Sequence, residues 1–386
     1  SRPHFDSYEE TVEKTSFLIQ DAIKRQMVSD VPICTFLSGG VDSSVVSAVC
    51  AAELKKQGKK LTTFSFDFID NDKYFKANSF QPSQDRPYVD KMVSFLDSDH
   101  HYLECDNKMQ ADLLYRSVDA HDLPCMADID SSLQYFCEEV SHSHKVVLTG
   151  ECADEVFGGY PWFHREEMLN SGTFPWTPSL TPRKVLLKDD LVKSLHMDEY
   201  VKKIYDRSVS EINVLPSENE IETNRRRIGY LNIRFFMQTL LNRMDRTSMF
   251  SGLEARVPFA DRKLVDYVFN IPWEMKAKDG LVKNILRQAS KGLLPDEILF
   301  RRKSPYPKTY NPYYENLLAK RLKEVLSDST SPLHSLLDLK QVTQFLENPK
   351  DYGAPWYGQL MAGPQMIAYL LQIEYFLRKY NVSIRI

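Results

Sequence analysis

The sequence predicts an α/β fold, with a doubly wound parallel sheet in the first half and a largely helical second half. Four short apolar runs occur before residue 150, and each is followed by a helical pattern or a loop. Strands that alternate with helices are joined by right-handed crossovers and form parallel sheets. After about residue 190 the strand pattern fades and apolar residues recur at helical spacing. We therefore expect one domain over 1–386, with an α/β part at 1–190 and a mainly helical part at 191–386.

The strands of the sheet are expected where the apolar runs stand. An amphipathic helix over 14–27 precedes them, and the four predicted strands are Val31–Leu37, Leu61–Phe68, His100–Cys105 and Lys145–Thr149. In a sheet of this kind ligands bind at the carboxyl ends of the strands, near the point where the strand order reverses. The loops after the first and fourth strands are therefore the expected place of a site.

Helices are predicted between the strands and throughout the second half. The segment 45–52 is nearly continuous in small and branched apolar residues, as expected for a helix packed against a sheet, and 133–140 repeats the helical spacing. The same spacing recurs at 228–235, 281–291 and 357–378. The second half is therefore expected to be mostly helical.

Two irregular segments interrupt these patterns. Residues 161–183 contain four prolines among aromatic and polar residues, and we expect them to connect the two parts. Residues 69–87 are rich in Asp, Asn, Lys and Gln and form a long loop after the second predicted strand. This loop is either a lid over a ligand or a solvated insertion.

Composition narrows the class of ligand and the location. The 49 basic and 53 acidic residues give a formal net charge of −4, whereas a nucleic-acid surface needs concentrated positive charge. Six scattered cysteines without paired spacing indicate reduced thiols. No apolar run reaches the ~18–20 residues of a membrane span, and the polar start lacks the apolar part of a signal peptide. We expect a cytoplasmic protein that acts on a small polar substrate and has neither nucleic acid nor membrane as a partner.

The most informative segment is 37–44, with the sequence LSGGVDSS, directly after the first predicted strand. Its two glycines let the backbone turn tightly and approach an anion, while its three serines offer hydroxyl donors. The following helix adds free N–H groups and its positive dipole end. Asp42 would tolerate phosphates only through a shared Mg²⁺. The segment predicts a phosphate cradle, and a glycine turn with hydrophilic neighbours is the alternative.

A second segment, 149–160 with the sequence TGECADEVFGGY, follows the fourth predicted strand. It holds three acids within five residues, Glu151, Asp154 and Glu155, which repel one another unless a cation or substrate compensates them. Asp154 can complete a Mg²⁺ shell with Asp42, and Glu151 can face the reacting centre as a base or positioning group. An acidic turn at the surface is the alternative interpretation.

These segments and two later ones resemble known motifs. The first resembles the SGGxDSS loop of N-type ATP pyrophosphatases, and the second resembles the GEGSDE(L/V)xxGY motif of asparagine synthetases. Residues 242–249 and 252–259 resemble the asparagine synthetase pattern LxRxDRxSM…GLEARVPFLD, and 294–306 resembles LP…RxKxGF. The departures from these patterns are Cys152 for Gly, Ala260 for Leu, Pro305 for Gly and Tyr306 for Phe.

The resemblance implies a sheet of the adenine nucleotide alpha hydrolase-like (ATP pyrophosphatase) type and a two-step reaction. Mg-ATP would adenylate the side-chain carboxylate of aspartate with release of pyrophosphate, and ammonia would then give asparagine and AMP. Glu151 stands at the position linked to adenylate formation and ammonia attack, and Lys303 at the position that stabilises charge on the α-phosphate. The implied ATP site comprises Leu37, Phe66, Thr149 and Gly150 for the base and ribose, Ser38, Gly39, Gly40, Ser43 and Ser44 for the pyrophosphate, and Asp42 and Asp154 for Mg²⁺.

The resemblance also implies partners. Glutamine-using asparagine synthetases begin with a glutaminase domain whose nucleophile is an N-terminal cysteine. This chain reaches the first motif within 40 residues, so we expect a synthetase domain that by itself uses free ammonia. The domain is either natural in this form or part of a longer parent protein with a glutaminase domain, and the second alternative is favoured. Aspartate and ammonia are the expected small-molecule partners, and a homodimer is one expected assembly.

For several charged residues the sequence leaves two interpretations open. Lys283 and Arg287 stand at i, i+4 and face either phosphate or solvent. Lys303 is either the catalytic cation or a surface lysine. Two pairs of histidines, 100–101 and 142–144, lack converging ligands, so we expect no metal there. Four further residues are explained either by substrate contact or by structural ion pairs: Arg243, Asp245, Arg256 and Asp261.

Three rival functions stay open. β-Lactam synthetases share the first loop but commonly have Tyr where this chain has Glu151. GMP and NAD synthetases share that loop but not the GLEARVPF segment. A catalytically silent nucleotide-binding protein would lack Asp42, Asp154 or Lys303, and all three are present.

Overall fold

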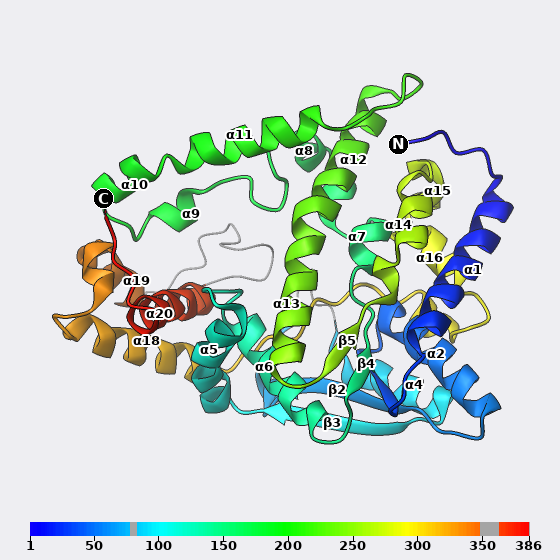
Figure 1. Ribbon diagram of the computed structural model, residues 1–386, viewed down its shortest axis with the longest axis horizontal. Helices are drawn as coiled ribbons and strands as arrows, with labels where there is room; N and C mark the ends of the chain where they lie inside the picture. The colour runs from blue at the N-terminus through cyan, green and yellow to red at the C-terminus, as the bar shows by residue number, and fades with distance from the viewer. Residues whose placement is uncertain (78–82, 348–362, 386) are drawn as a thin grey trace.

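The computed structural model describes residues 1–77, 83–347 and 363–385. Its centre is a parallel five-stranded sheet with the strand order β3-β2-β1-β4-β5 (Figure 1). The predicted doubly wound parallel sheet and the helical second half are confirmed. The strands are β1 (Ile33–Phe36), β2 (Thr62–Phe68), β3 (Asp99–Cys105), β4 (Val146–Leu148) and β5 (Glu254–Arg256).

The fifth strand was not predicted, because its three residues, Glu-Ala-Arg, form no apolar run. It lies at the edge of the sheet, where Val146 pairs with Glu254 and Leu148 with Arg256. The backbone N–H of Thr149 also donates to the Arg256 carbonyl at 2.9 Å. A segment from beyond residue 190 therefore completes the sheet and holds the loop that follows β4.

The strand order places the reversal point between β1 and β4. The chain runs outward from β1 through β2 to β3 on one side and returns to β4 and β5 on the other. The carboxyl ends of β1 and β4 are thus adjacent, and the two loops predicted to carry the site, 37–44 and 149–160, leave the sheet there. Open α/β sheets bind their ligands at this point.

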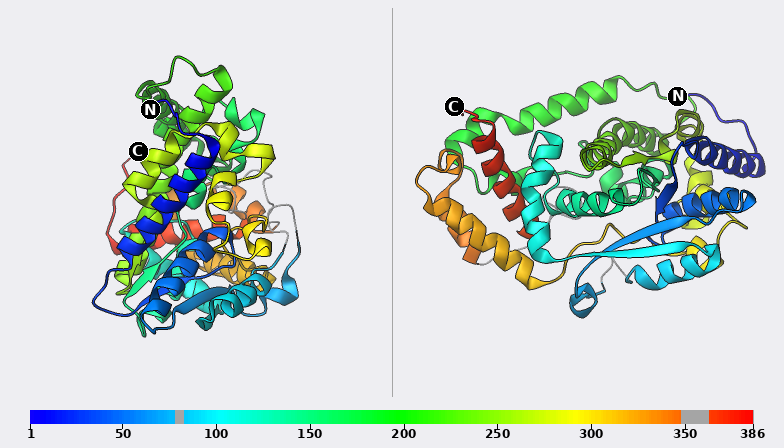
Figure 2. Two further views of the ribbon diagram at one scale, coloured as in Figure 1. Left: turned by 90° about the vertical axis from the view of Figure 1, so that its right-hand side faces the viewer. Right: turned by 60° about the horizontal axis from the view of Figure 1, so that its bottom comes forward.

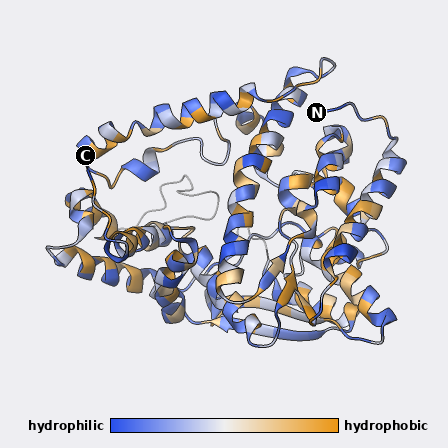
Figure 3. Cartoon of the chain, viewed as in Figure 1, coloured by the Kyte–Doolittle hydropathy of each residue, from blue (hydrophilic) through white to orange (hydrophobic). Residues whose placement is uncertain are grey.

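Alternating residues of the strands lie on opposite faces of the sheet, and each face packs into a different core. Ile33, Val146 and Leu148 belong to a core shared with the helices α1 (Tyr8–Gln26), α2 (Val41–Lys56) and α4 (Arg86–Leu96). Cys34 and Val147 belong to a second core, shared with α6 (Asp128–Ser141) and α13 (Gln238–Phe250). Successive side chains of a strand point to opposite faces, so one apolar run supplies both cores. Hydrophobic residues are accordingly concentrated around the sheet and the helices packed on it (Figure 3).

The first helix, α1 (Tyr8–Gln26), begins earlier than the predicted 14–27. Ser7 accepts a hydrogen bond from the backbone of Glu10, whose side chain accepts one from the backbone of Ser7. This capping box satisfies two N–H groups at the helix start, and the sequence analysis overlooked it.

The predicted helix after the first strand is α2 (Val41–Lys56), and the predicted helix before the fourth is α6 (Asp128–Ser141). The other long helices of the first half are α4 (Arg86–Leu96) and α5 (Asn107–His121). In the segment 69–87 only a short helix, Asn71–Tyr74, and the start of α4 are described, and 78–82 lie outside the described residues. The choice between lid and insertion stays a prediction.

The second half is built mainly from long helices. α12 (Glu220–Leu231), the π-helix η2 (Asn232–Met237) and α13 (Gln238–Phe250) follow one another as a single rod, which crosses the molecule in Figure 1. The other long ones are α10 (Asp189–Leu195), α11 (Met197–Ser210), α18 (Pro312–Ser327), α19 (Leu339–Glu347) and α20 (Gly363–Lys379). The predicted helix over 357–378 begins among residues outside the described ranges.

The last three helices pack with α5 in a separate core that includes Ala111, Leu114, Leu318 and Leu371. This core lies at the end of the molecule away from α1, as the right-hand view of Figure 2 shows. Within the described ranges no helix is long and apolar enough to cross a membrane. The remaining short helices are α3 (Asn71–Tyr74), α7 (Ala153–Phe157), η1 (Pro161–Phe163), α8 (Glu166–Leu169), α9 (Thr181–Lys184), η3 (Pro258–Ala260), α14 (Arg262–Phe269), α15 (Trp273–Lys276), η4 (Lys278–Gly280), α16 (Asn284–Ala289), α17 (Asp296–Leu299) and η5 (Pro332–Ser335).

Candidate active site

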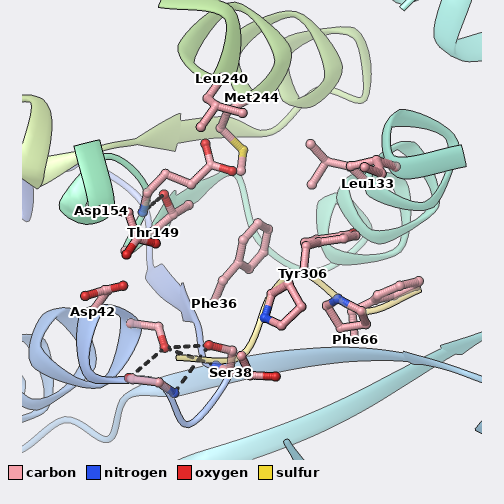
Figure 4. A pocket seen from close by; sticks show the side chains of 18 of the residues that line it. Phe36, Ser38, Asp42, Phe66, Leu133, Thr149, Asp154, Leu240, Met244 and Tyr306 are labelled. Atoms are coloured by element: carbon pink, nitrogen blue, oxygen red, sulfur yellow. Dashed lines mark hydrogen bonds between the residues drawn. The ribbon is translucent and has the colours of Figure 1, made fainter. Parts of the chain in front are cut away.

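A cavity of about 500 Å³ opens at the carboxyl ends of β1, β2 and β4. Asp42 and Asp154 lie on one side of it, and Phe66 and Tyr306 lie on the other (Figure 4). Most of the residues proposed from the sequence line this one cavity: Leu37, Ser38, Gly40, Asp42, Ser43, Phe66, Thr149, Gly150, Glu151, Asp154 and Lys303. Gly39 and Ser44 are not among its lining residues.

The first loop is held in shape by its own serines. The Oγ atoms of Ser38 and Ser43 lie 3.0 Å apart, and the backbone N–H of Ser38 donates to Ser43 Oγ at 3.1 Å. Gly40 is the N-cap of α2 and makes no side-chain hydrogen bond, so the first N–H groups of this helix have no side-chain cap. Helix N-termini of this kind bind anions.

Gly39 and Ser44 support the loop from behind. Gly39 has a φ of +68°, and a Cβ there would lie 2.7 Å from the Cβ of Tyr88 in α4. Ser44 is buried within α2, and its backbone N–H donates to the Gly40 carbonyl at 3.1 Å. These two residues thus shape the cradle rather than line it.

The two loops touch through glycines. A Cβ on Gly150 would lie 2.5 Å from the backbone nitrogen of Ser43, so only glycine allows the second loop to approach the first so closely. A Cβ on Gly159 would lie 1.8 Å from Asp154 Oδ1. The backbone therefore packs directly against the carboxylate that the sequence assigned to metal binding.

Asp42 and Asp154 converge on one buried cation, Lys283. Its Nζ lies 2.6 Å from Asp42 Oδ2 and 2.6 Å from Asp154 Oδ1. Lys303 Nζ lies 2.9 Å from the other oxygen of Asp154. Burial opposes the ionisation of Asp154, but Lys283 and Lys303 hold the pKa of this carboxyl below its ordinary value. Of the two interpretations of Lys283, the solvated face is wrong, because its side chain is only 2% exposed.

The residues present fit a Mg²⁺ ion. Asp42 and Asp154 supply hard oxygen ligands from two separate loops, which is the ligand type that Mg²⁺ prefers. Lys283 shows that a positive charge is stable between these carboxylates. We therefore retain both as candidate Mg²⁺ ligands.

Glu151 is held by Arg243 of α13, whose Nη2 donates to Glu151 Oε1 at 2.5 Å. Burial raises the pKa of Glu151, and the Arg243 guanidinium opposes this rise. The turn that follows Glu151 has Cys152 in place of the family's Gly, and Cys152 adopts a φ of +72°. Arg243 therefore forms an ion pair within the active-site wall, as the structural interpretation expected, and its partner is a candidate catalytic residue.

Glu155, the third acid of the cluster, is buried and accepts a hydrogen bond from the hydroxyl of Tyr160. Burial and the nearby Asp154 carboxylate raise the pKa of Glu155 to about 7. Lys303 Nζ lies 3.7 Å from the centre of the Tyr160 ring, a cation–π contact. Lys303 therefore points into the cavity and is not a surface lysine.

Arg301 was not assigned to this site by the sequence, whereas Arg287 was expected to face either phosphate or solvent. Arg301 donates to the Ser38 carbonyl at 3.0 Å, pairs with Asp85 and lies over the Tyr88 ring. Arg287 is buried and donates to backbone carbonyls of 282, 299 and 301, so it supports the segment that carries Arg301 and Lys303. Neither the phosphate nor the solvent interpretation of Arg287 holds.

Aromatic residues form the remaining wall. Phe66 stacks on Tyr306, with ring centroids 6.1 Å apart. The π-helix η2 turns Phe236 toward Trp162, with ring centroids 5.2 Å apart, and both line the cavity. The segment 161–183 is therefore part of the site wall rather than a plain connector. Its tryptophans were the available signal, because large aromatic residues are unusual in a solvated linker.

Two of the other charged residues have structural partners. Arg256 pairs with Glu254 and donates to the backbone carbonyls of Gln26, at the end of α1, and Val28. Asp261 caps α14 and pairs with Arg25. Asp245 is exposed on α13. For Arg256 and Asp261 the interpretation as structural ion pairs is the one that matches these contacts.

The asparagine synthase family model matches residues 15–378, so the chain belongs to the asparagine synthase family. "Asparagine synthetase [glutamine-hydrolyzing] 3" of Bacillus subtilis is 49% identical over 386 residues, which are 100% of this chain and 62% of that protein. "Asparagine synthetase [glutamine-hydrolyzing] 1" of the same organism is 27% identical over 364 residues, covering 86% of this chain and 54% of its own length.

The chain therefore spans less than two thirds of these curated relatives. Among solved structures, an NAD⁺ synthetase from Burkholderia pseudomallei overlaps with 41% of this chain and 58% of its own, at 17% identity and a TM-score of 0.23. This similarity is too low to support an argument about the fold. The fold assignment follows from the sheet topology.

Proposed function

We propose that this chain is an ATP-dependent amide-forming domain that converts aspartate and ammonia to asparagine, AMP and pyrophosphate. The single observation that supports this most is the meeting of the phosphate-cradle loop, two candidate Mg²⁺ ligands, Glu151 and Lys303 around one cavity, in a member of the asparagine synthase family. Ionisable groups that converge in a cleft and have shifted pKa values, as Glu151 and Asp154 do, are typical of a functional site.

The nucleotide is proposed to lie across the ends of β1 and β2. Leu37, Phe66, Thr149 and Gly150 would contact the base and ribose, and the serines and N–H groups of the first loop would hold the pyrophosphate. Asp42 and Asp154 would hold Mg²⁺, which when bound would neutralise charge on the phosphate oxygens. Lys283 and Lys303 add two fixed positive charges beside these carboxylates.

Activation of the carboxylate explains the need for ATP. A carboxylate resists attack by a neutral amine, whereas an acyl-AMP offers a good leaving group, so one hard step becomes two easier ones. Lys303 would stabilise the charge that grows on the α-phosphate, because its ammonium points into the cavity. Glu151, oriented by Arg243, would position the nucleophile or accept its proton.

The partners belong to the same proposal. We expect the domain to use free ammonia by itself, and to receive ammonia from a glutaminase domain within a longer parent protein. The division into an α/β part at 1–190 and a helical part at 191–386, a homodimeric assembly and a cytoplasmic location also remain proposals.

The test is pyrophosphate release from Mg-ATP in parallel reactions. One contains aspartate and ammonium chloride, and the others replace aspartate by glutamate, omit ammonium, or offer glutamine as the nitrogen source. The proposal expects release that depends on aspartate, with asparagine formed only when ammonium is present. Measurable ATP binding without any aspartate-dependent release would overturn the assignment of aspartate.

A further inference from the structure

Three side chains with metal-binding atoms converge at the junction of α5 and α6, outside the ATP site. They are His121 at the end of α5, Cys125 in the connecting turn and Asp130 in the first turns of α6. One ligand atom from each lies within 4.8 Å of the other two. This cluster was not predicted from the sequence, because its members do not follow a paired metal-ligand spacing.

Each of the three is oriented so that one electron pair stays available. His121 Nδ1 lies 2.8 Å from the Ser117 carbonyl, which accepts its proton and leaves Nε2 as the unprotonated nitrogen. His121 Nε2 is buried and has no hydrogen-bond partner among the described residues. A histidine whose other nitrogen is held by a carbonyl in this way is the usual arrangement at a metal site.

Asp130 and Cys125 are also oriented by hydrogen bonds. Asp130 is 1% exposed, and while its Oδ2 accepts the Met126 N–H, its Oδ1 has no hydrogen-bond partner within the described ranges. Gln372 of α20 donates to Cys125 Sγ at 3.2 Å and accepts the Cys125 N–H at 3.2 Å. Burial and the Asp130 carboxylate raise the pKa of the Cys125 thiol, so the thiolate that binds metals forms only as a metal ion replaces the thiol proton.

We propose that His121, Cys125 and Asp130 bind a divalent cation of the zinc class. The set of one imidazole, one thiolate and one carboxylate matches the ligands of Zn²⁺, and three protein ligands leave the fourth tetrahedral position for water. Zinc bonds of about 2.0–2.3 Å hold ligand atoms roughly 3.3–3.8 Å apart, so the side chains need to close by no more than about 1.5 Å. As the Zn–S bond forms, the thiol proton passes to solvent.

The charges around the three side chains permit a divalent cation to bind. Arg243 Nε lies 4.0 Å from Asp130 Oδ1, so an added cation alone would be repelled. A thiolate and a carboxylate together cancel the charge of a divalent ion, and the complex is neutral. The ion would tie the α5–α6 turn to α20 through Gln372, next to Met126 and Ile129 of the cavity wall.

The test is titration of the chelator-treated chain with Co²⁺ in the absence of ATP. A cobalt–thiolate bond gives a near-ultraviolet charge-transfer band, whereas Co²⁺ held by Asp42 and Asp154 has only oxygen ligands from the protein and gives none. We expect the band to saturate at one equivalent and to be displaced by Zn²⁺. It should disappear in Cys125→Ser and persist in the matched control Cys105→Ser.

Two further measurements keep the test decisive if Cys125→Ser does not fold. His121→Gln should weaken Zn²⁺ binding by more than the roughly 10–100-fold expected for loss of a supporting contact, as in Gln372→Met. In the unmodified chain, Zn²⁺ should slow alkylation of Cys125 as measured by peptide mass spectrometry. A missing band, or Zn²⁺ affinity unchanged by His121→Gln, would refute the site. The proposed synthetase activity does not depend on either result.

Discussion

Lys283 Nζ lies 2.6 Å from Asp42 and 2.6 Å from Asp154, so one buried ammonium joins the loops that follow β1 and β4. Lys283 itself adopts a left-handed conformation with a φ of +56°, which costs conformational energy for a residue other than glycine. The ion pairs compensate this cost. The lysine therefore stabilises the arrangement of the two carboxylates that we assign to Mg²⁺.

Lys283→Met should destabilise the protein, because it leaves two buried carboxylates facing each other without a cation. Breaking a buried ion pair from one side costs about 3–5 kcal/mol. Urea unfolding should show a free energy of unfolding lower by that amount, and millimolar Mg²⁺ should recover part of it. The exposed Lys291→Met is the control. Equal stability of the two variants would contradict the role of Lys283.

Glu151→Ala should lower asparagine formation by roughly 10²–10⁴-fold, the usual loss when a general acid–base group is removed, while ATP affinity changes little. Arg243→Leu should produce a similar but smaller loss, since it leaves Glu151 present but unoriented. Steady-state turnover and nucleotide binding by calorimetry measure both effects. Glu13→Ala, an exposed change on α1, should alter neither. Full turnover in Glu151→Ala would remove this residue from the mechanism.

Gly159→Ala should abolish most activity, because the new Cβ would lie 1.8 Å from Asp154 Oδ1 and displace the carboxylate. Gly229→Ala offers a matched control within α12, where the Cβ would only make ordinary contact with Phe269 at 3.6 Å. That change should raise stability by about 0.5–1 kcal/mol, since alanine favours the helix. Pyrophosphate release and thermal unfolding separate the two outcomes. Wild-type activity in Gly159→Ala would show that the second loop is looser than described.

His100 should make the protein less stable in mild acid. Burial lowers the pKa of His100 from its ordinary 6.5 to about 4, and its Nδ1 lies 2.8 Å from Thr63 Oγ1. The unfolded chain therefore binds the proton more readily between these values, so the stabilisation is complete above about pH 6.5 and is lost as the pH falls toward 4.

His100→Asn should flatten the pH dependence in this window. Urea midpoints at pH 7.5 and pH 5 measure the effect, and the exposed His142→Asn serves as the control. If the two variants lost the same stability between these pH values, the assignment to His100 would fail.

The sequence placed the site well where local pattern and chemistry agree. The apolar runs gave four strands, and the loops after the first and fourth carry Ser38, Asp42, Glu151 and Asp154, which all line one cavity. Strand periodicity and glycine spacing are local properties, so the sequence alone is enough to recognise them. The roles of these residues in catalysis stay predictions.

The sequence did not predict features that depend on a partner far away along the chain. β5 has no apolar run, because an edge strand of three residues needs little burial. Arg301 reaches Ser38, and Arg243 reaches Glu151, across more than 90 residues of chain. Long charged side chains suit a solvated face as well as a buried pair, so residue type alone does not choose between them.

By itself the sequence determined the parallel sheet, the loop at 37–44 that we propose as a phosphate cradle and the acidic loop beside it, since each depends on neighbouring residues. Only the tertiary structure decided that Lys283 bridges Asp42 and Asp154, and that His121, Cys125 and Asp130 meet at the α5–α6 turn. The physical reason is the same in both cases. Electrostatic and coordination energies depend on the distance between atoms in space, and the packing of the whole chain sets that distance.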